Sequence, residues 1–193
     1  MTTTRKIIHS VSVSLDGFFA GPEGQIDWHL VDDELHRHFN EQLATMGAFL
    51  EGRVTHELMA EYWPTADADP AAPAAVAEFA HIWREMPKVV FSRTLEKAEW
   101  NATVRHEVDV AEIEALKAQR GGDLVLGSAD LAATFRRHDL IDEYRLYVHP
   151  VLLGTGRRLF AVATGTHTVR LVETRTFGNG VVLLRYARDR TAE

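Results

Sequence analysis

One short sequence in the second half of the chain combines the residue types that bind anions. Leu124 to Leu126 is an apolar run typical of a buried strand, Gly127-Ser128-Ala129 follows without a bulky side chain, and Leu131 begins a helical apolar spacing. Amides in the first turn of a helix have no partner within the helix and carry the positive end of its dipole. The junction is therefore a candidate phosphate site, although a tight turn that binds nothing would have the same sequence.

Two other predicted strands end in a small residue, and in both an arginine follows it. Ala48-Phe49-Leu50 precedes Gly52-Arg53-Val54-Thr55, and Val89-Val90-Phe91 precedes Ser92-Arg93-Thr94. Guanidinium groups form charge-assisted hydrogen bonds with phosphate, and the hydroxyls are short donors. A single such arginine is more often a surface residue, but three junctions of one type indicate a phosphorylated cofactor. The compact Gly-x-Gly-x-x-Gly fingerprint is missing, which argues against a standard dinucleotide site.

Four carboxylates near the first loop and helix are candidates for acid–base chemistry: Asp16, Asp27, Asp32 and Asp33. Asp33 comes two residues before the apolar Leu35 and is expected to project toward the sheet. Asp32 would also suit a helix N-cap, and Asp16 would suit a turn before glycine. Spacing alone does not decide which of the four takes part in catalysis.

Composition bounds the class of protein. The 193 residues are 46% hydrophobic and 25% charged, which predicts one globular domain over residues 1–193. A net charge of −7 argues against nucleic acid or an anionic membrane surface as a partner. There is no cysteine, so thiol catalysis and disulfides are excluded. His36 and His38 diverge on one helix, so we expect no metal site. No signal sequence or membrane-spanning run is present, so we expect a cytoplasmic protein.

The elements that must position these residues alternate between strands and helices. This alternation predicts an α/β fold with a doubly wound, mostly parallel sheet, helices on both faces and a C-terminal antiparallel hairpin. Ligands in such sheets bind beyond the carboxyl ends of the strands, where the three junctions meet. Thr65 to Ala77 is expected to be a surface loop, and a helix is expected from Asp32 onward. Further strands are expected at Lys6 to Ser14, Tyr144 to Leu153, Thr168 to Thr176 and Val181 to Tyr186.

Five motifs follow one another from about Lys6 to Tyr186. They are Ser14-Leu-Asp16-Gly17-Phe-Phe-Ala-Gly21, Gly52-Arg53-Val-Thr55-His-Glu57, Val90-Phe-Ser92-Arg93-Thr94-Leu95, Gly127-Ser-Ala-x-Leu131, and Asp142-Glu143 with Pro150-Val-Leu-Leu-Gly154-Thr-Gly156 and Leu159-Phe160. Together they resemble the motifs of the RibD C-terminal-domain family, in its stand-alone branch with a dihydrofolate-reductase-like fold. The motifs are specific for fold and cofactor and much less so for substrate.

The resemblance implies a reductase that uses NADPH. Residues that match the family motifs at their own positions would hold the cofactor. They are Gly52, Arg53 and Thr55 on the diphosphate side, Ser92, Arg93 and Thr94 near the adenosine phosphate, and Gly127, Ser128, Ala129 and Leu131 around the diphosphate. Dihydrofolate reductases favour two glycines where this chain has Gly127-Ser128. The segment from Trp28 to Asp33 is similar to the tryptophan-to-acid spacing of those enzymes, which makes Asp33 the substrate-facing carboxylate.

The expected activity is hydride transfer from NADPH to a C=N or C=O bond of a small heterocycle or ribosylaminopyrimidine, as in 5-amino-6-(5-phosphoribosylamino)uracil reduction in riboflavin biosynthesis. Asp33 would relay the proton with His149 as a neighbour, and Phe18, Trp28 and Leu30 would form apolar walls. A dihydrofolate or pterin reductase and a non-catalytic NADPH-binding regulatory module are the alternatives. A homodimer is expected because long β-rich strands near the C-terminus leave an edge to cover.

Overall fold

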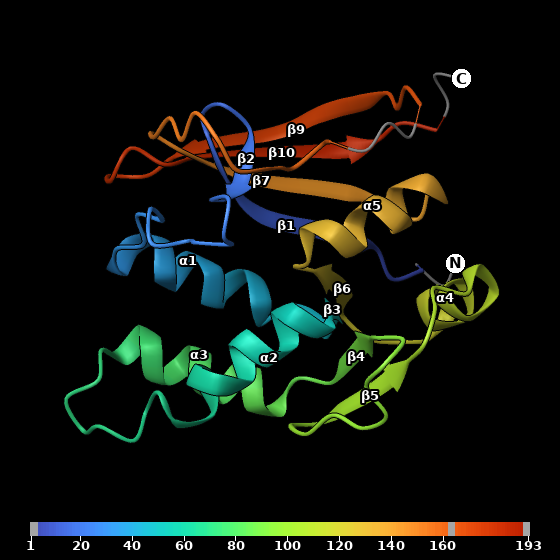
Figure 1. The fold of residues 1–193 in the computed structure, drawn as a ribbon, viewed down its shortest axis with the longest axis horizontal. Coiled ribbons are helices and arrows are strands. Elements are labelled where there is room, and N and C mark those ends of the chain that lie inside the picture. Colours follow the sequence, from blue (N-terminus) through green and yellow to red (C-terminus); the bar gives the residue numbers. More distant parts are fainter. Residues whose placement is uncertain (1–3, 162–164, 191–193) are drawn as a thin grey trace.

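The computed structural model describes residues 4–161 and 165–190, which form an eight-stranded sheet with helices on both faces (Figure 1). The strand order is β5-β4-β3-β6-β1-β7-β10-β9. Neighbouring strands from β5 to β7 are parallel, and β10 and β9 add an antiparallel hairpin. The predicted fold class is confirmed. The strands are β1 (Ile7–Ser14), β3 (Met46–Gly52), β4 (Lys88–Phe91), β5 (Ala102–Arg105), β6 (Asp123–Leu126), β7 (Glu143–His149), β9 (Val169–Thr176) and β10 (Val182–Arg188).

Side chains alternate along the central strands, so each strand contributes to a hydrophobic core on either face. Ala48 and Leu50 of β3 pack with helices α4 and α5, whereas Phe49 packs on the other face with α3. Helix α1 lies on the same face as α3, where its Leu35 packs against Tyr147 of β7. The helices are α1 (Asp33–Leu43), α2 (Arg53–Tyr62), α3 (Ala74–Glu85), α4 (Val110–Ala118) and α5 (Ala129–Arg137), with a 3-10 turn η1 (Trp63–Thr65).

Five elements differ from the sequence-based expectation. Helix α3 begins inside the segment Thr65 to Ala77, which was expected to be a loop; it begins after Pro73, and Trp83 near its end is fully buried. Strand β7 ends at His149 rather than Leu153, because Pro150 has no amide hydrogen for a ladder. The edge strand β5 and the two-stranded sheet of β2 (Phe18–Ala20) and β8 (Arg157–Arg158) have too few residues to be recognised from alternation.

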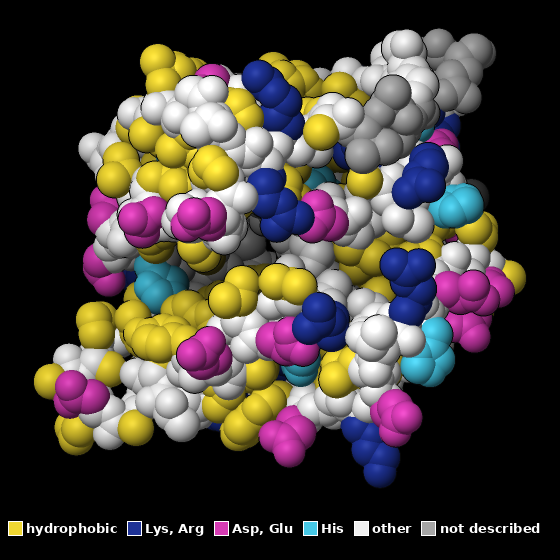
Figure 2. Space-filling view, in the orientation of Figure 1, with side chains coloured by type: hydrophobic (Ala, Val, Ile, Leu, Met, Phe, Trp, Pro, Cys, Tyr) yellow, Lys and Arg dark blue, Asp and Glu magenta, His cyan; other side chains and the backbone are white. Residues whose placement is uncertain are grey.

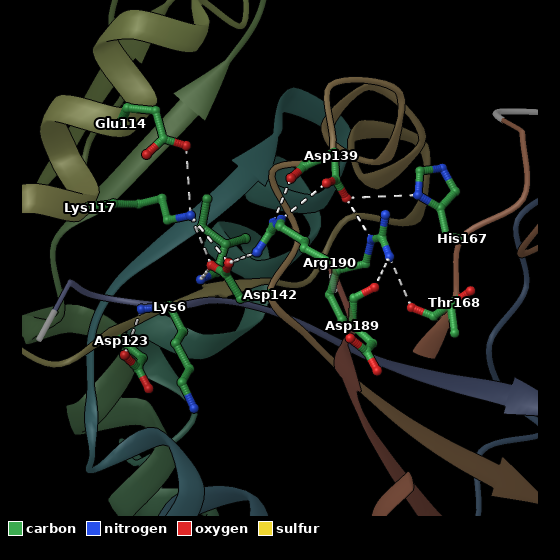
Figure 3. Close-up of polar contacts among 12 residues, drawn as sticks. Lys6, Glu114, Lys117, Asp123, Asp139, Asp142, His167, Thr168, Asp189 and Arg190 are labelled. Carbon is green, nitrogen blue, oxygen red and sulfur yellow. Dashed lines mark hydrogen bonds and ion pairs between the residues drawn. The ribbon is translucent and has the colours of Figure 1, made fainter. Parts of the chain in front are cut away.

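A network of ion pairs fixes the C-terminal end of β10 against the start of β7 and the end of α5 (Figure 3). Asp139 follows α5 in a left-handed conformation (φ 50°) and accepts hydrogen bonds from Arg188 (2.8 Å) and Arg190 (3.0 Å). Asp142 accepts from Arg190 (2.9 Å) and contacts the Lys117 ammonium at 3.0 Å. Partial burial opposes ionisation of Asp139, but the two guanidinium groups lower its pKa below the ordinary value.

We expect Asp139→Asn to lower the free energy of unfolding by about 1–2 kcal/mol at pH 7 in urea titrations. Asparagine tolerates the left-handed conformation, so the loss reports the missing charge beside the buried Arg188 side chain. The lowered pKa places this stabilisation above pH 3.8, the ordinary value, and removes it as the pH falls through the folded-state pKa. Glu114→Gln, which removes an exposed carboxylate 3.7 Å from Lys117, is the control and should cost less than about 0.5 kcal/mol. Equal losses in both variants would contradict this assignment.

Candidate functional site

A cleft of about 870 Å³ opens at the carboxyl ends of the central parallel strands. Figure 2 shows the hollow near the middle of the view, with hydrophobic side chains along its lower edge. It extends from the ends of β3, β4 and β6 and the starts of α2 and α5 to β1, β7 and α1. Its volume is in the range of cofactor and small-molecule sites.

All ten residues that were predicted to bind the cofactor line this one cleft. They come from three separate strand-to-helix or strand-to-turn junctions and are Gly52, Arg53, Thr55, Ser92, Arg93, Thr94, Gly127, Ser128, Ala129 and Leu131. Parallel strands bring their carboxyl ends to one edge of the sheet. That geometry brings together residues that lie up to 79 positions apart, between Gly52 and Leu131.

The hydroxyl of Ser128 joins two of these junctions. It accepts a hydrogen bond from the Gly52 amide (2.8 Å) and donates one to the Thr55 hydroxyl (2.7 Å). Because Ser128 is 5% exposed, these bonds lie in a poorly solvated place and hold the starts of α2 and α5 in a fixed relation. The serine that stands in place of a second glycine thus has a structural role of its own.

The starts of α2 and α5 leave amides available to a ligand. Helices α1 and α4 are capped by the side chains of Asp32 and Asp109, whereas α2 and α5 have no side-chain cap. Helix α3, which follows Pro73, also lacks one. A Cβ placed on Gly127 would meet no atom within 4 Å, so the space above this residue is open. Two uncapped helix starts and this open space fit the diphosphate of a dinucleotide.

The arginines of the cleft lie near its mouth. Arg53 contacts Glu57 at 2.7 Å, one helical turn away, and its side chain is 44% exposed. Arg93 is exposed at the end of β4, where the Ser92 hydroxyl accepts from the amides of Thr94 (3.2 Å) and Leu95 (3.0 Å). Ser92 therefore orders the turn that presents Arg93. Both arginines are available to a phosphate that enters from solvent.

The far end of the cleft has a polar floor under α1. Ser10 and Ser12 of β1 lie beside Arg145 and Tyr147 of β7 in the parallel register, and all four line the cleft. Gln42 of α1 completes this group by accepting a hydrogen bond from Arg145 (2.6 Å). Burial raises the pKa of Tyr147 to about 12, so the phenol stays protonated. Apolar side chains that line the same cleft include Phe39, Leu43, Met46, Phe49, Phe79 and Val125.

Two stacked imidazole rings lie beside the cleft. His149 is fully buried, and its Nδ1 accepts a hydrogen bond from the Leu30 amide (3.1 Å), which places the proton of the neutral ring on Nε2. His29 lines the cleft and stacks on His149 with ring centroids 5.1 Å apart, while Trp28 packs edge-on against both. Burial, and then the neighbouring His149, lower the pKa of His29 to about 4; burial also lowers the pKa of His149. Both rings are neutral at pH 7.

None of the four candidate carboxylates lines the cleft. The side chain of Asp33 is 63% exposed and pairs with Arg37 on the solvent side of α1. The reason is helical geometry: two residues correspond to about 200°, so Asp33 points away from the face of the buried Leu35. Asp32 caps α1 by accepting from the Leu35 amide (2.9 Å), and Asp27 is exposed.

Asp16 holds two loops together instead of facing a substrate. It accepts hydrogen bonds from the Ser14 hydroxyl (2.6 Å) and the Gly154 amide (2.8 Å), and these bonds lower its pKa to about 2. The expected apolar walls also lie outside the cleft lining. Phe18 is 4% exposed with Arg158 over its ring, Leu30 is 44% exposed, and Trp28 is half-buried against the histidines.

Sequence reasoning missed several polar groups of the cleft. Arg145 could have been noticed, because it is a charged residue between Tyr144 and Leu146 in a predicted strand. Ser10 and Ser12 alternate with apolar residues on β1, which also indicates one polar face. Buried Glu51, which contacts His56 at 3.1 Å, had no such signal. No group of three residues among the described His, Asp and Glu could hold a metal ion.

Similarity to known proteins identifies the family of the chain. The family model of the RibD C-terminal domain matches residues 5–183. The chain belongs to this family. Its relatives in the bacterium Bacillus subtilis (strain 168) include the uncharacterized protein YyaP, which is 35% identical over 183 residues and covers 94% of both chains. The suspected family is thus confirmed.

Solved structures agree with the RibD C-terminal fold. A protein named after riboflavin biosynthesis from Shewanella sp. PV-4 superposes with a TM-score of 0.74 at 22% identity, over 96% of this chain and 99% of the other. A dihydrofolate reductase from Enterococcus faecalis, in complex with NADP(H), gives 0.61 at 16% identity over 95% and 96%. These likenesses confirm the dihydrofolate-reductase-like fold. In the described part of the chain, no helix has the length and apolar character needed to cross a membrane.

We expect stability to fall as the pH drops below 6.5, because His29 has a lowered folded-state pKa and must take up a proton where it is desolvated. A shift to about 4 contributes up to about 3 kcal/mol, present above pH 6.5 and lost between pH 6.5 and 4. In urea titrations across this range, His29→Gln should show a flatter profile than the unaltered chain. His81→Gln, at an exposed site on α3, is the control. Parallel profiles for all three proteins would refute this role of His29.

Proposed function

We propose that this member of the RibD C-terminal family is a reductase that transfers a hydride from NADPH to a C=N or C=O bond of a small heterocycle, such as a ribosylaminopyrimidine. The observation that carries the proposal is the continuity of the cleft. Its outer half combines two uncapped helix starts with Arg53 and Arg93, and its inner half has hydroxyls and one guanidinium. Such a cleft has room for a dinucleotide and a second ligand together.

The chain's own residues would bind and orient the cofactor. The first-turn amides of α2 and α5 would hold the diphosphate. Arg53, at the mouth on the diphosphate side, would extend toward the adenosine phosphate that Arg93 contacts. When bound, NADPH supplies the hydride. The apolar side chains of Phe49, Val125 and Met46 would keep water from the reacting atoms.

NADPH is expected to bind at least about tenfold more tightly than NADH. Loss of one charge-assisted contact costs about 1.5–3 kcal/mol, so Arg53→Ala and Arg93→Ala should each weaken NADPH binding about 10- to 100-fold and NADH binding less. Fluorescence titration of the reduced nucleotides measures both. Arg37→Ala, which removes an exposed arginine outside the cleft, should leave both affinities unchanged. Equal affinity of the unaltered chain for the two nucleotides would contradict the proposed preference for NADPH.

We further propose that His29, backed by His149, orients the substrate at the atom that becomes protonated and that solvent delivers the proton. His29 lines the cleft, and its buried Nε2 has no hydrogen-bond partner among the described residues. This assignment competes with the sequence-based hypothesis for Asp33. Asp33 is exposed on the solvent side of α1 and does not line the cleft, which favours His29 in this proposal.

The two assignments differ in their expected kinetics. His29→Gln should lower kcat by about 10²-fold, while Asp33→Asn should keep it within about twofold. The substrate for the assay comes from a screen of NADPH oxidation with ribosylaminopyrimidines and pteridines, which also separates a pterin reductase from the proposed enzyme. A loss of 10²- to 10⁴-fold in Asp33→Asn with unchanged NADPH affinity would favour the carboxylate. NADPH binding without any turnover would instead favour a regulatory module.

We also propose a homodimer that pairs through strand β9. This strand lies at the edge of the sheet, all eight of its residues are exposed, and Val169, Leu171 and Val172 are 39–50% exposed. A long exposed apolar edge strand favours association. Light scattering at micromolar concentration should give about twice the chain mass of 21.7 kDa, and Leu171→Lys should shift it toward the monomer. A monomeric mass for the unaltered chain would reject the dimer.

A further inference from the structure

The floor of the cleft contains a buried guanidinium with one unsatisfied end. Arg145 is 7% exposed. Its Nε donates to Glu143 (2.7 Å) and its Nη1 donates to Gln42 (2.6 Å). No acceptor among the described residues contacts Nη2, and Arg145 lines the cleft. Two bonds therefore fix the plane of the guanidinium, and the third nitrogen remains available to a ligand.

The charges around Arg145 do not cancel. Glu143 also accepts two hydrogen bonds from Arg185, at 2.7 and 3.1 Å, so one buried carboxylate serves two guanidinium groups. Burial raises the pKa of Glu143, but bonds from Arg185 and Arg145 outweigh it and lower the pKa, so the carboxylate is ionised. Glu173 contacts Arg185 at 3.3 Å but is 45% exposed, where solvent screens its charge. The floor thus keeps an excess of positive charge.

The groups beside Arg145 are donors too. Ser10 lies next to it across the β1–β7 pair, and Tyr147 keeps its phenolic proton. The other carboxylates of the cleft are engaged elsewhere: Glu51 contacts His56 at 3.1 Å, and Asp130 pairs with Arg157 at the mouth. A negatively charged oxygen would therefore find a cation and hydroxyl donors at this place.

We infer that the substrate carries an anionic oxygen group, a carboxylate or a phosphate, that Arg145 binds. The inference rests on the proposed function, which assigns the outer half of the cleft to the cofactor. The three cofactor junctions belong to β4, β3 and β6, whereas Arg145 lies on β7, beyond β1 in the sheet. The anion is thus part of the second ligand. Glu143 and Gln42 are positioning residues that orient the guanidinium.

Three probes of similar size test the inference on the full chain saturated with NADPH at low ionic strength. Benzoate presents a carboxylate, phenyl phosphate presents a phosphate, and benzamide is the neutral analogue. Isothermal titration should show that at least one anion binds about tenfold or more tightly than benzamide. The preferred anion identifies which oxygen group the site takes.

Variants assign the binding to Arg145. Arg145→Gln should weaken binding of the preferred anion about 10- to 100-fold while NADPH affinity stays unchanged. Gln42→Glu leaves Arg145 in place but brings a carboxylate to its Nη1, so it should cause a similar loss even if Arg145→Gln does not fold. Arg93→Gln is the matched control from the cofactor end, which should weaken NADPH and leave anion affinity unchanged, measured at saturating nucleotide.

The failure of this inference and the failure of the proposed function look different. Benzamide that binds as tightly as the anions, or full anion affinity in folded Arg145→Gln and Gln42→Glu with NADPH bound, would overturn the role of Arg145 and leave the reductase intact. Absence of NADPH binding by the unaltered chain would overturn the proposed function. Anion binding to the chain without nucleotide would then decide the role of Arg145 on its own.

Discussion

The geometry of the cleft depends on two hydrogen bonds of the Ser128 hydroxyl. It accepts one from the Gly52 amide and donates the other to the Thr55 hydroxyl. Parallel pairing of β3 with β6 brings the two strand ends to one edge, but pairing alone leaves the following helices free to tilt. Because the buried Ser128 hydroxyl both accepts and donates a hydrogen bond, it fixes the starts of α2 and α5 together. The unpaired amides of α2 and α5 are thereby held toward a common point before any ligand arrives.

The helix starts differ in whether a side chain or open space faces their first-turn amides. Asp32 and Asp109 satisfy first-turn amides of α1 and α4, which lie away from the proposed cofactor half of the cleft. The starts of α2 and α5 lack such side chains and would gain stability from one. Their uncapped first-turn amides face the cleft, so a bound anion would accept hydrogen bonds from them. The open space at Gly127 leaves room for such an anion.

The sheet face under α1 carries a row of charged side chains that runs from the exposed edge strand β9 to the buried Arg145. Arg145, Arg185 and Glu173 lie next to one another across β7, β10 and β9, and Ser10 extends the row into the cleft. Buried ion pairs seldom stabilise a fold more than apolar residues of equal volume. Here they fix the direction of one guanidinium at the cleft floor.

The sequence alone was sufficient for whatever depends on local chemistry. Alternation and spacing predicted the parallel sheet, and a small residue at three strand ends indicated junctions that would meet at its carboxyl edge. The resemblance to the RibD C-terminal-domain family supplied the ten proposed cofactor residues, which all line the cleft. The expected loop Thr65 to Ala77 was wrong only where it overlaps the first turn of α3, a helix whose Trp83 is buried among residues that include Phe49 of β3 and Val125 of β6.

Side-chain direction and partners on the substrate side were decided by tertiary structure. Asp33 and Asp32 are equally acidic in the sequence, but packing of Leu35 turns Asp33 to solvent and makes Asp32 a cap. His29 and Arg145 each depend on a residue more than 100 positions away in the sequence. The partner of His29 is His149, and the partner of Arg145 is Gln42 of α1. Desolvation and charge balance depend on all atoms within a few ångströms, and only the folded chain determines which atoms those are.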